Sequence, residues 1–456
     1  MAPVSTIQFR DLVKDNLKNN KSPLPFVFTP HPVIGLPPDA LYEYLDGNDP
    51  ETGHPVIEEI IDALTKSVAA SSVESETVGV PAFGIRQPFA GPETEDNLQR
   101  LFYEKGWTDG LPIILPTEER VRNMLTGTSH PAGEVVGEVF QMDTRETVKY
   151  TVENIAVIAV MAGARLEHFP VILAIASTRQ TALIPSTTAF GAMILVNGPI
   201  RNEIGMNSGI GAFSAVNQSN AVIGRAWLLM SHCWGYNRPG KTLWSSQGNN
   251  LTYNSMCCAE NEERSVWEPF HVQKGYRADE SVVSIFRGWT LFNSPGTAAN
   301  RTLGEELKIE LGVILPTGSA ATIIMDPLVA RNLKENQGFE TKEDYCRWLS
   351  ENVKMPAGRF WGADHIDMLV ASQAYQGIEP YASWKKLPDD ELIAPYHDPS
   401  QISIVVVGGE TSPLWKSSDY RHGISASIDR WRPNAEDECA DGTCGIPDPN
   451  DPSLYD

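Results

Sequence analysis

The chain has 456 residues, of which 41% are hydrophobic and 21% charged, so it can bury a sizeable core and belongs to the globular class. Lys and Arg total 36 against 58 Asp and Glu, which gives a formal net charge of −22. A charge of this sign repels phosphate backbones and anionic membrane surfaces, which argues against nucleic acid or lipid as the main partner. The six cysteines are too few for a small disulfide-stapled secreted scaffold.

The most apolar stretch is residues 155–176, and its pattern does not indicate a membrane-spanning segment. Arg165, Glu167, His168 and Pro170 interrupt it, and neither half reaches the ~20 apolar residues that cross a bilayer. The first twenty residues carry charges throughout and lack the apolar centre of a secretory signal. We therefore expect a cytoplasmic protein with no membrane-spanning segment.

Residues 1–95 are expected to form an extended N-terminal arm that contains one helix. Six prolines between residues 23 and 38 prevent regular helix there. Residues 55–68 have the spacing of an amphipathic helix. Its apolar face consists of Ile57, Ile60, Ile61 and Leu64.

Residues 96–300 are expected to form the main domain. A first helix ends at Gly106, a usual C-cap residue, and a second begins after Thr117, whose hydroxyl can cap it. The pattern of the hydrophobic centre, residues 148–196, predicts a helix, a strand, a helix and a strand in this order. Residues 220–232 read as a further helix.

A second region is expected over residues 301–432. Residues 309–315 read as a strand, residues 320–332 and 342–353 as helices, and residues 401–407 as a β-branched strand that leads into two glycines.

This alternation of strands and helices predicts an α/β fold with a mixed or mostly parallel sheet core in two domains, preceded by the extended N-terminal arm. Residues 433–456 are acidic and proline-rich, which is typical of an extended C-terminal tail.

The densest polar run inside an apolar region is residues 197–275. Arg201 and Asn202 directly follow a predicted buried strand, where open α/β sheets bind ligands, and an arginine there can clamp a carboxylate or phosphate. The alternative is a turn in which Arg201 pairs with Glu203. The substrate-binding candidates are Arg201, Asn202, Asn207 and Ser208.

An acidic segment within this run supplies the catalytic candidates, Glu260, Glu262, Glu263 and His271. Paired carboxylates in a partly apolar site have their pKa values pushed apart, which gives one acid and one base, and a nearby histidine can carry protons. The sequence therefore predicts Glu262 or Glu263 as the base, with His271 and Glu260 assisting, and a loss of turnover in Glu263→Gln. The alternative is an acidic helix start whose cysteines belong to the core.

This pattern favours an enzyme of lyase or hydrolase type that acts on a small polar or anionic metabolite. A thiol- or metal-assisted oxidoreductase is the second hypothesis. Its thiol candidates are Cys257, Cys258, Cys439 and Cys444, and the candidate ligands for a metal ion, the one cofactor considered, are His232, Cys258 and His271. No CxxC, HExxH or HxH spacing supports a metal site. The third hypothesis is a non-catalytic ligand-binding or assembly protein, since eleven tryptophans and an N-terminal arm suit a homo-oligomer interface.

Several strings together resemble a family of largely uncharacterised bacterial proteins, the UGSC-like (seleno)proteins. They are GWTDGLP (106–112), VNGPIRNEIGMNSG (196–209) and AENEE…WEPFHVQKGY (259–276), and the resemblance covers about residues 31–290. The family's namesake tetrapeptide implies thiol redox chemistry, but here the nearest string is Asp441-Gly442-Thr443-Cys444, in which only Gly442 and Cys444 match. The resemblance therefore lends little support to redox activity in this chain.

Overall fold

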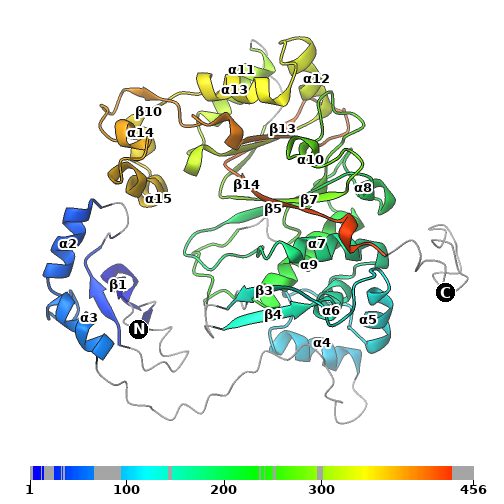
Figure 1. The fold of residues 1–456 in the computed structure, drawn as a ribbon, viewed down its shortest axis with the longest axis horizontal. Helices are drawn as coiled ribbons and strands as arrows, with labels where there is room; N and C mark the ends of the chain where they lie inside the picture. Colours follow the sequence, from blue (N-terminus) through cyan, green and yellow to red (C-terminus); the bar gives the residue numbers. More distant parts are fainter. Residues whose placement is uncertain are drawn as a thin grey trace, which may run out of the picture. The chain divides into compact units, whose positions relative to one another are not determined.

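The computed structural model describes residues 4–11, 13–14, 25–31, 33, 36–65, 94–141, 146–235, 238–240, 242–249, 253–294 and 301–433 (Figure 1). Helices combine with sheets that contain both parallel and antiparallel strand pairs, so the predicted α/β class with a mixed sheet is confirmed.

The chain divides into two compact units that are not consecutive in sequence. Unit 1 comprises Met1–Ala82, Gly288–Val405 and Ser412–Arg421, and unit 2 comprises Phe83–Arg287, Val406–Thr411 and His422–Asp456. The predicted division into residues 96–300 and 301–432 thus differs from the observed one, because the chain returns to unit 2 twice after Arg287.

The N-terminal part of unit 1 forms a small folded element of two strands and two helices. Strand β1 (Val4–Thr6) pairs in parallel with β2 (Val27–Thr29), and α2 (Pro38–Asp46) and α3 (Val56–Thr65) follow. The helix predicted at residues 55–68 is confirmed as α3. Its apolar stripe is largely exposed to solvent, however; the exposed side chains are Ile57, Ile61 and Leu64.

The main sheet of unit 1 has the strand order β12-β9-β13-β8, and β13 runs antiparallel to both β9 and β8. These strands are β8 (Leu291–Asn293), β9 (Ala321–Met325), β12 (Ile402–Val406) and β13 (Trp415–Ser418). The helices of this part are α11 (Leu303–Leu311), α12 (Pro327–Glu335), α13 (Lys342–Asn352), α14 (Ala357–Trp361), α15 (Asp364–Tyr375) and α16 (Tyr381–Trp384). The predicted helix 342–353 and strand 401–407 are confirmed as α13 and β12.

Two elements predicted in this region are wrong. Residues 309–315 do not form a strand, because α11 begins after the Thr302 cap and runs through the start of that segment, burying Leu307 and Leu311 on one face. Residues 320–332 are not one helix. The segment begins with the fully buried strand β9, and only after Asp326, whose side chain accepts from the Leu328 amide, does α12 begin.

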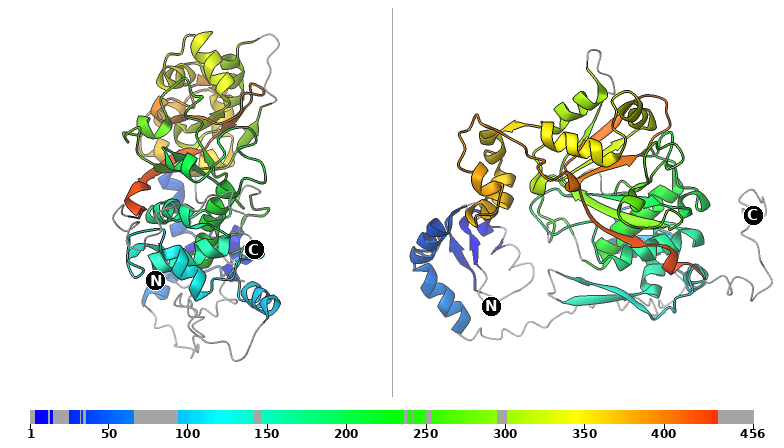
Figure 2. Two further views of the ribbon diagram at one scale, coloured as in Figure 1. Left: turned by 90° about the vertical axis from the view of Figure 1, so that its right-hand side faces the viewer. Right: turned by 45° about the horizontal axis from the view of Figure 1, so that its top comes forward.

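The main sheet of unit 2 has the strand order β14-β7-β5-β6, and β5 and β6 are parallel neighbours. These strands are β5 (Gly191–Asn197), β6 (Cys258–Ala259), β7 (Val282–Gly288) and β14 (Arg421–Ser427), and an antiparallel hairpin is formed by β3 (Val135–Phe140) and β4 (Thr147–Thr151). The helices are α4 (Glu95–Glu104), α5 (Glu118–Leu125), α6 (Val152–Ala162), α7 (Phe169–Ser177), α8 (Ile200–Glu203), α9 (Gln218–Cys233) and α10 (Phe270–Gln273). Helices α7 and α9 lie between the main sheet and the hairpin (Figure 1 and Figure 2).

The hydrophobic centre of unit 2 follows the order strand, helix, helix, strand rather than the predicted helix, strand, helix, strand. Strand β4 ends at Thr151, which with Asn154 forms a capping box that starts α6. The two helices α6 and α7 are almost entirely buried. Within the described part of the chain, no helix is both long and apolar enough to cross a bilayer.

The GWTDGLP string is bound to α9 within unit 2. The guanidinium of Arg225, in α9, donates two hydrogen bonds to Asp109 of this string, from Nε to Oδ2 at 2.8 Å and from Nη2 to Oδ1 at 3.0 Å. His232, in the last turn of α9, forms a hydrogen bond with the Gly106 carbonyl oxygen through Nε2 at 3.0 Å. These bonds therefore stabilise the scaffold.

Gly224 in α9 packs directly against backbone, and we expect Gly224→Ala to destabilise unit 2. A Cβ at this position would fall inside the van der Waals radius of the Asn254 carbonyl oxygen. Overpacking of this kind costs about 1–3 kcal/mol or more, whereas helix propensity alone would favour alanine by about 1 kcal/mol. The measurement is the thermal midpoint compared with Gly133→Ala, where nothing lies within 4 Å of the new methyl. An equal midpoint for the two variants would contradict the close packing.

Candidate functional site

Side chains from two distant stretches meet where β5 and β6 end. These strands are parallel neighbours, so their carboxyl ends lie at one edge of the sheet. Asn197 closes β5, and its Nδ2 donates to Glu260 Oε2 at 2.7 Å and to Glu262 Oε1 at 2.9 Å. Arg201 and Asn202, which follow β5, also contact the acidic segment, since Arg201 Nη2 and Asn202 Nδ2 both donate to Glu263 Oε1.

Glu260 is fully buried and acts as a structural acceptor. Besides Asn197, the Phe270 amide donates to its Oε2 at 2.7 Å and the Val406 amide to its Oε1 at 3.3 Å. Both carboxylate oxygens therefore already accept from the protein. This arrangement favours a role in positioning α10 over the predicted role in proton transfer.

Arg201 lies at the start of α8 with only 3% of its surface exposed, and protein oxygens surround its guanidinium. Nη1 donates to the Glu260 carbonyl oxygen and to Glu263 Oε2, both at 3.0 Å, and Nη2 donates to Glu263 Oε1 at 2.8 Å. Nε lies 3.0 Å from Glu262 Oε1. The guanidinium therefore holds the acidic segment in place. Its nitrogens are occupied by protein oxygens, so it does not face a substrate anion in the way that the sequence predicted.

Glu263 is the charge partner of this arginine. Its side chain is 54% exposed, and Asn202 Nδ2 donates to Oε1 at 2.9 Å. The hydrogen bond from Arg201 is the main reason that the pKa of Glu263 falls to about 2. A carboxylate with such a low pKa is a poor proton acceptor near neutral pH. The geometry therefore argues against Glu263 as the base. Asn202, a predicted substrate-binding residue, uses its side-chain amide to bind Glu263.

Glu262 is held through one carboxylate oxygen, Oε1, whereas Glu263 is held through both. Its Oε1 accepts from Asn197 Nδ2 and from the Gly198 amide at 2.8 Å, beside Arg201 Nε. Within the described ranges no donor reaches Oε2, and the side chain keeps 12% of its surface exposed. Gly198 adopts φ +83°, and the space above it is filled by the Glu280 backbone, so the turn that aims its amide requires glycine. Glu262 is thus a fixed carboxylate with one available oxygen.

His271, on α10, is fully buried beside this carboxylate. Its Nδ1 lies 4.0 Å from Glu262 Oε1, and among the described residues neither ring nitrogen finds a hydrogen-bond partner. Asn197 Oδ1 is also buried without a partner. An unsatisfied buried polar atom costs about 1–3 kcal/mol, so these three atoms beside the Glu262 carboxylate form a polar cluster that the described protein atoms leave unsatisfied.

The other two substrate-binding candidates, Asn207 and Ser208, form hydrogen bonds with other parts of the protein. Asn207 Nδ2 donates to the Ile210 carbonyl oxygen and to Asn217 Oδ1, both at 2.9 Å, and Asn207 Oδ1 accepts from the Gly209 amide. Ser208 accepts from the Gly408 amide through its backbone carbonyl oxygen at 2.9 Å. Both residues shape the loop, and the amide of Asn207 has no atom left over for a substrate.

The thiol candidates are buried in unit 2. Cys257 and Cys258 are fully enclosed, and burial raises the pKa of both thiols, so neither forms a thiolate readily. His232 forms a hydrogen bond with the Gly106 carbonyl oxygen through Nε2. Within the described ranges, no group of three or more His, Cys, Asp or Glu side chains is placed to hold a metal ion. Cys439 and Cys444 lie outside the described residues.

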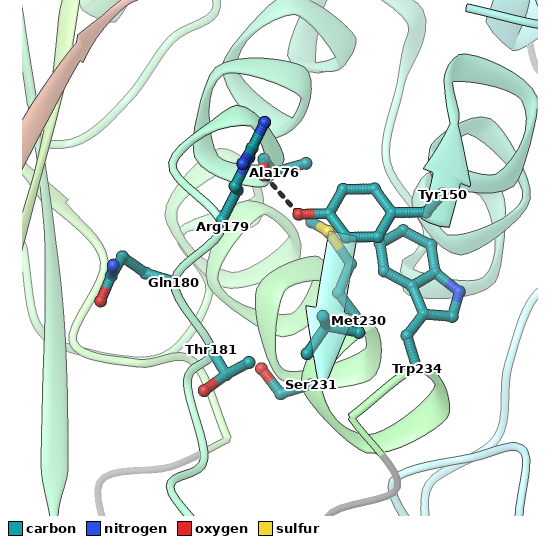
Figure 3. Close-up of a pocket in the computed structure, with 9 residues that line it drawn as sticks. Tyr150, Ala176, Arg179, Gln180, Thr181, Met230, Ser231 and Trp234 are labelled. Atoms are coloured by element: carbon teal, nitrogen blue, oxygen red, sulfur yellow. Dashed lines mark hydrogen bonds between the residues drawn. The ribbon is translucent and has the colours of Figure 1, made fainter. Parts of the chain in front are cut away.

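Unit 2 also has a shallow hollow away from the predicted residues (Figure 3). Tyr150 and Trp234 stack at 4.5 Å on one side, and the Tyr150 hydroxyl donates to the Ala176 carbonyl oxygen. The space open to the centre of a water molecule is about 10 Å³, room for about one water, so the hollow is too small to enclose a ligand. None of the candidate catalytic side chains lines it.

Sequence reasoning missed two groups that the structure places at the site, Asn197 and the Gly198 amide. The signal was available in the string VNGPIR, in which a polar residue and a glycine follow a fully apolar strand. Compared with protein-family models, curated proteins and solved structures, the chain gives no match.

Proposed function

We propose that the protein is an enzyme of lyase or hydrolase type that acts on a small polar metabolite by acid–base chemistry, with Glu262 as base and His271 as its partner. The observation that carries the proposal is the pairing of a fixed carboxylate, free at one oxygen, with a buried imidazole that has no hydrogen-bond partner. Groups held by the fold in this way need no reorganisation when a proton moves.

In the proposed reaction Glu262 Oε2 takes a proton from the substrate. The imidazole of His271 donates a proton to the leaving group and regains one from Glu262 or solvent after the product departs, and Asn197 Oδ1 accepts a hydrogen bond that orients the substrate. Lyases and hydrolases both require such a pair, because one group must be deprotonated while a leaving group is protonated.

The charges at the site narrow the substrate class. The site holds three carboxylates and one guanidinium, and that guanidinium is already occupied by Glu262 and Glu263. The surplus of negative charge favours a neutral or cationic substrate, and it disfavours the anionic metabolites that the sequence also suggested.

The test is a screen in deuterated water. Small hydroxy acids, amides, amino acids and amines are incubated with the full chain, and proton NMR follows both product formation and deuterium uptake at carbon. We expect conversion or exchange in at least one neutral or cationic compound. Turnover confined to anions would overturn the charge argument, and inertness across all classes would count against the enzyme itself.

A thiol- or metal-assisted oxidoreductase remains the second candidate, although the burial of Cys257 and Cys258 gives it little support. Elemental analysis and thiol titration of the purified protein separate the two candidates, because stoichiometric metal or a reactive thiol would favour the oxidoreductase. Membership of the UGSC-like family is likewise a proposal that rests on the sequence strings. We also propose a cytoplasmic location, which the free thiol of Cys233 supports, since reducing compartments preserve thiols.

We also propose that the protein assembles as a homo-oligomer through α3, which exposes an apolar stripe that includes Ile61 and Leu64. We expect the double variant Ile61→Glu, Leu64→Glu to elute as a smaller species than the wild type in size-exclusion chromatography with light scattering. Glu58→Gln, on the same helix, should leave the mass unchanged. A wild-type mass equal to one chain would contradict the proposal.

A further inference from the structure

Three side chains on neighbouring strands of unit 2 form a hydrogen-bonded row that the proposed acid–base site does not use. Ser284 on β7 and Ser425 on β14 have their hydroxyl oxygens 2.7 Å apart, and Ser425 Oγ lies 2.9 Å from His422 Nε2. Strands β7 and β14 are adjacent in the sheet (Figure 1). The row therefore joins a buried hydroxyl, a half-buried hydroxyl and an imidazole.

The imidazole of His422 sits against two aromatic rings. The ring centroids of Phe270 and Phe286 lie 5.2 and 5.3 Å from its own. Burial, helped by the charge of Lys274, lowers the pKa of His422 to about 4. The ring is therefore neutral near pH 7, so one nitrogen is free to accept a proton from a hydroxyl held against it, and the low pKa makes it a weaker base than an exposed imidazole.

The pattern of donors follows once the neutral ring carries its proton on Nδ1, the tautomer that we assign here. Nε2 then accepts from the Ser425 hydroxyl, and the Ser284 hydroxyl donates to Ser425 Oγ. Each proton is used once. Tyr276 adds a bond from its hydroxyl to the Ser425 carbonyl oxygen at 3.0 Å, which fixes the strand at this position. The Ser425 hydroxyl is thus oriented towards a base before any substrate arrives.

We propose that Ser425 is a nucleophile, activated by His422, that accepts small acyl groups from esters or thioesters. Ser425 Oγ forms a bond to the acyl carbon while its proton passes to His422 Nε2. The bond from that carbon to the leaving oxygen or sulfur breaks, and the leaving group takes the proton from His422. Water then attacks the acyl-serine with His422 again as base, which releases the acid and restores the hydroxyl.

A fluorophosphonate probe tests this proposal on the full chain. Attack by Ser425 Oγ forms an O–P bond, fluoride leaves, and the proton goes to His422. We expect peptide mass spectrometry to find the label on Ser425, and we expect His422→Gln to lower the labelling rate about 100-fold, the usual contribution of a general base. Ser425→Ala should lose the label, whereas Ser427→Ala, on the same strand, should retain the wild-type rate.

A label on any residue other than Ser425, or no label on the wild-type protein, would overturn the proposal. An unchanged labelling rate in a folded His422→Gln variant would remove the imidazole from the mechanism. If that variant does not fold, Ser284→Ala replaces it, and we expect a reduced rate because the donor that orients Ser425 is gone. Hydrolysis of a short-chain thioester is measured from the thiol that it releases. This activity must be lost in Ser425→Ala and kept in Ser427→Ala.

Discussion

Glu262→Gln is expected to lower turnover of the substrate found in the deuterium screen by about 10²–10⁴-fold, because it removes the proton acceptor at Oε2. The substitution keeps the shape of the side chain and an oxygen that can accept from Asn197 and the Gly198 amide. The loss should therefore appear in the rate of proton removal and not in folding. Progress curves by proton NMR, together with circular dichroism of the variant, measure both.

Glu263→Gln is the matched control, since it is the same isosteric change one residue further on. Its carboxylate is committed to the Arg201 fork and has a pKa of about 2, so we expect activity within about tenfold of the wild type. The reverse result, with Glu263→Gln inactive and Glu262→Gln active, would reinstate the base that the sequence suggested equally well.

Arg201→Met is expected to destabilise unit 2 by about 3–5 kcal/mol, because it leaves the nearly buried Glu262 carboxylate and the buried Glu260 carbonyl oxygen without the guanidinium. The guanidinium contacts Glu262, Glu263 and the Glu260 carbonyl oxygen, and methionine replaces none of these bonds. Native-state hydrogen exchange of the β5 amides reports the free energy of opening of this unit by itself. Protection equal to that of the wild type would show that the cluster is solvated and weakly coupled.

Arg264→Met is the control for that experiment, because Arg264 pairs with Glu410 at 3.1 Å and is 64% exposed. An exposed pair contributes less than about 1 kcal/mol, so protection should hardly change. The pH dependence gives a second readout. The Arg201 bond depresses the pKa of Glu263 from 4.5 to about 2, so its contribution is complete above pH 4.5 and is lost as the pH falls through 2. Arg201→Met should abolish this part of the acid sensitivity.

Local sequence signals determined those elements whose boundaries depend on nearby residues. The Thr117 hydroxyl accepts from the Arg120 amide and starts α5, and the amphipathic segment at residues 342–353 becomes α13. The run at residues 401–407 becomes the buried strand β12. The segment at residues 309–315 failed because β-branched and apolar residues suit a strand as well as the buried face of a helix, and only packing against the rest of unit 1 decides between them.

The candidate site shows the same division. The sequence by itself brought Arg201, Glu262 and His271 into one hypothesis, because polar residues that follow apolar strands collect at the edge of an α/β sheet. Only the tertiary structure decided their roles. A guanidinium fork can hold two carboxylates at once, and its orientation engages both oxygens of Glu263 but only one of Glu262. That choice depends on side-chain directions set by β5, α8 and α10 together, which spacing along a single chain does not encode.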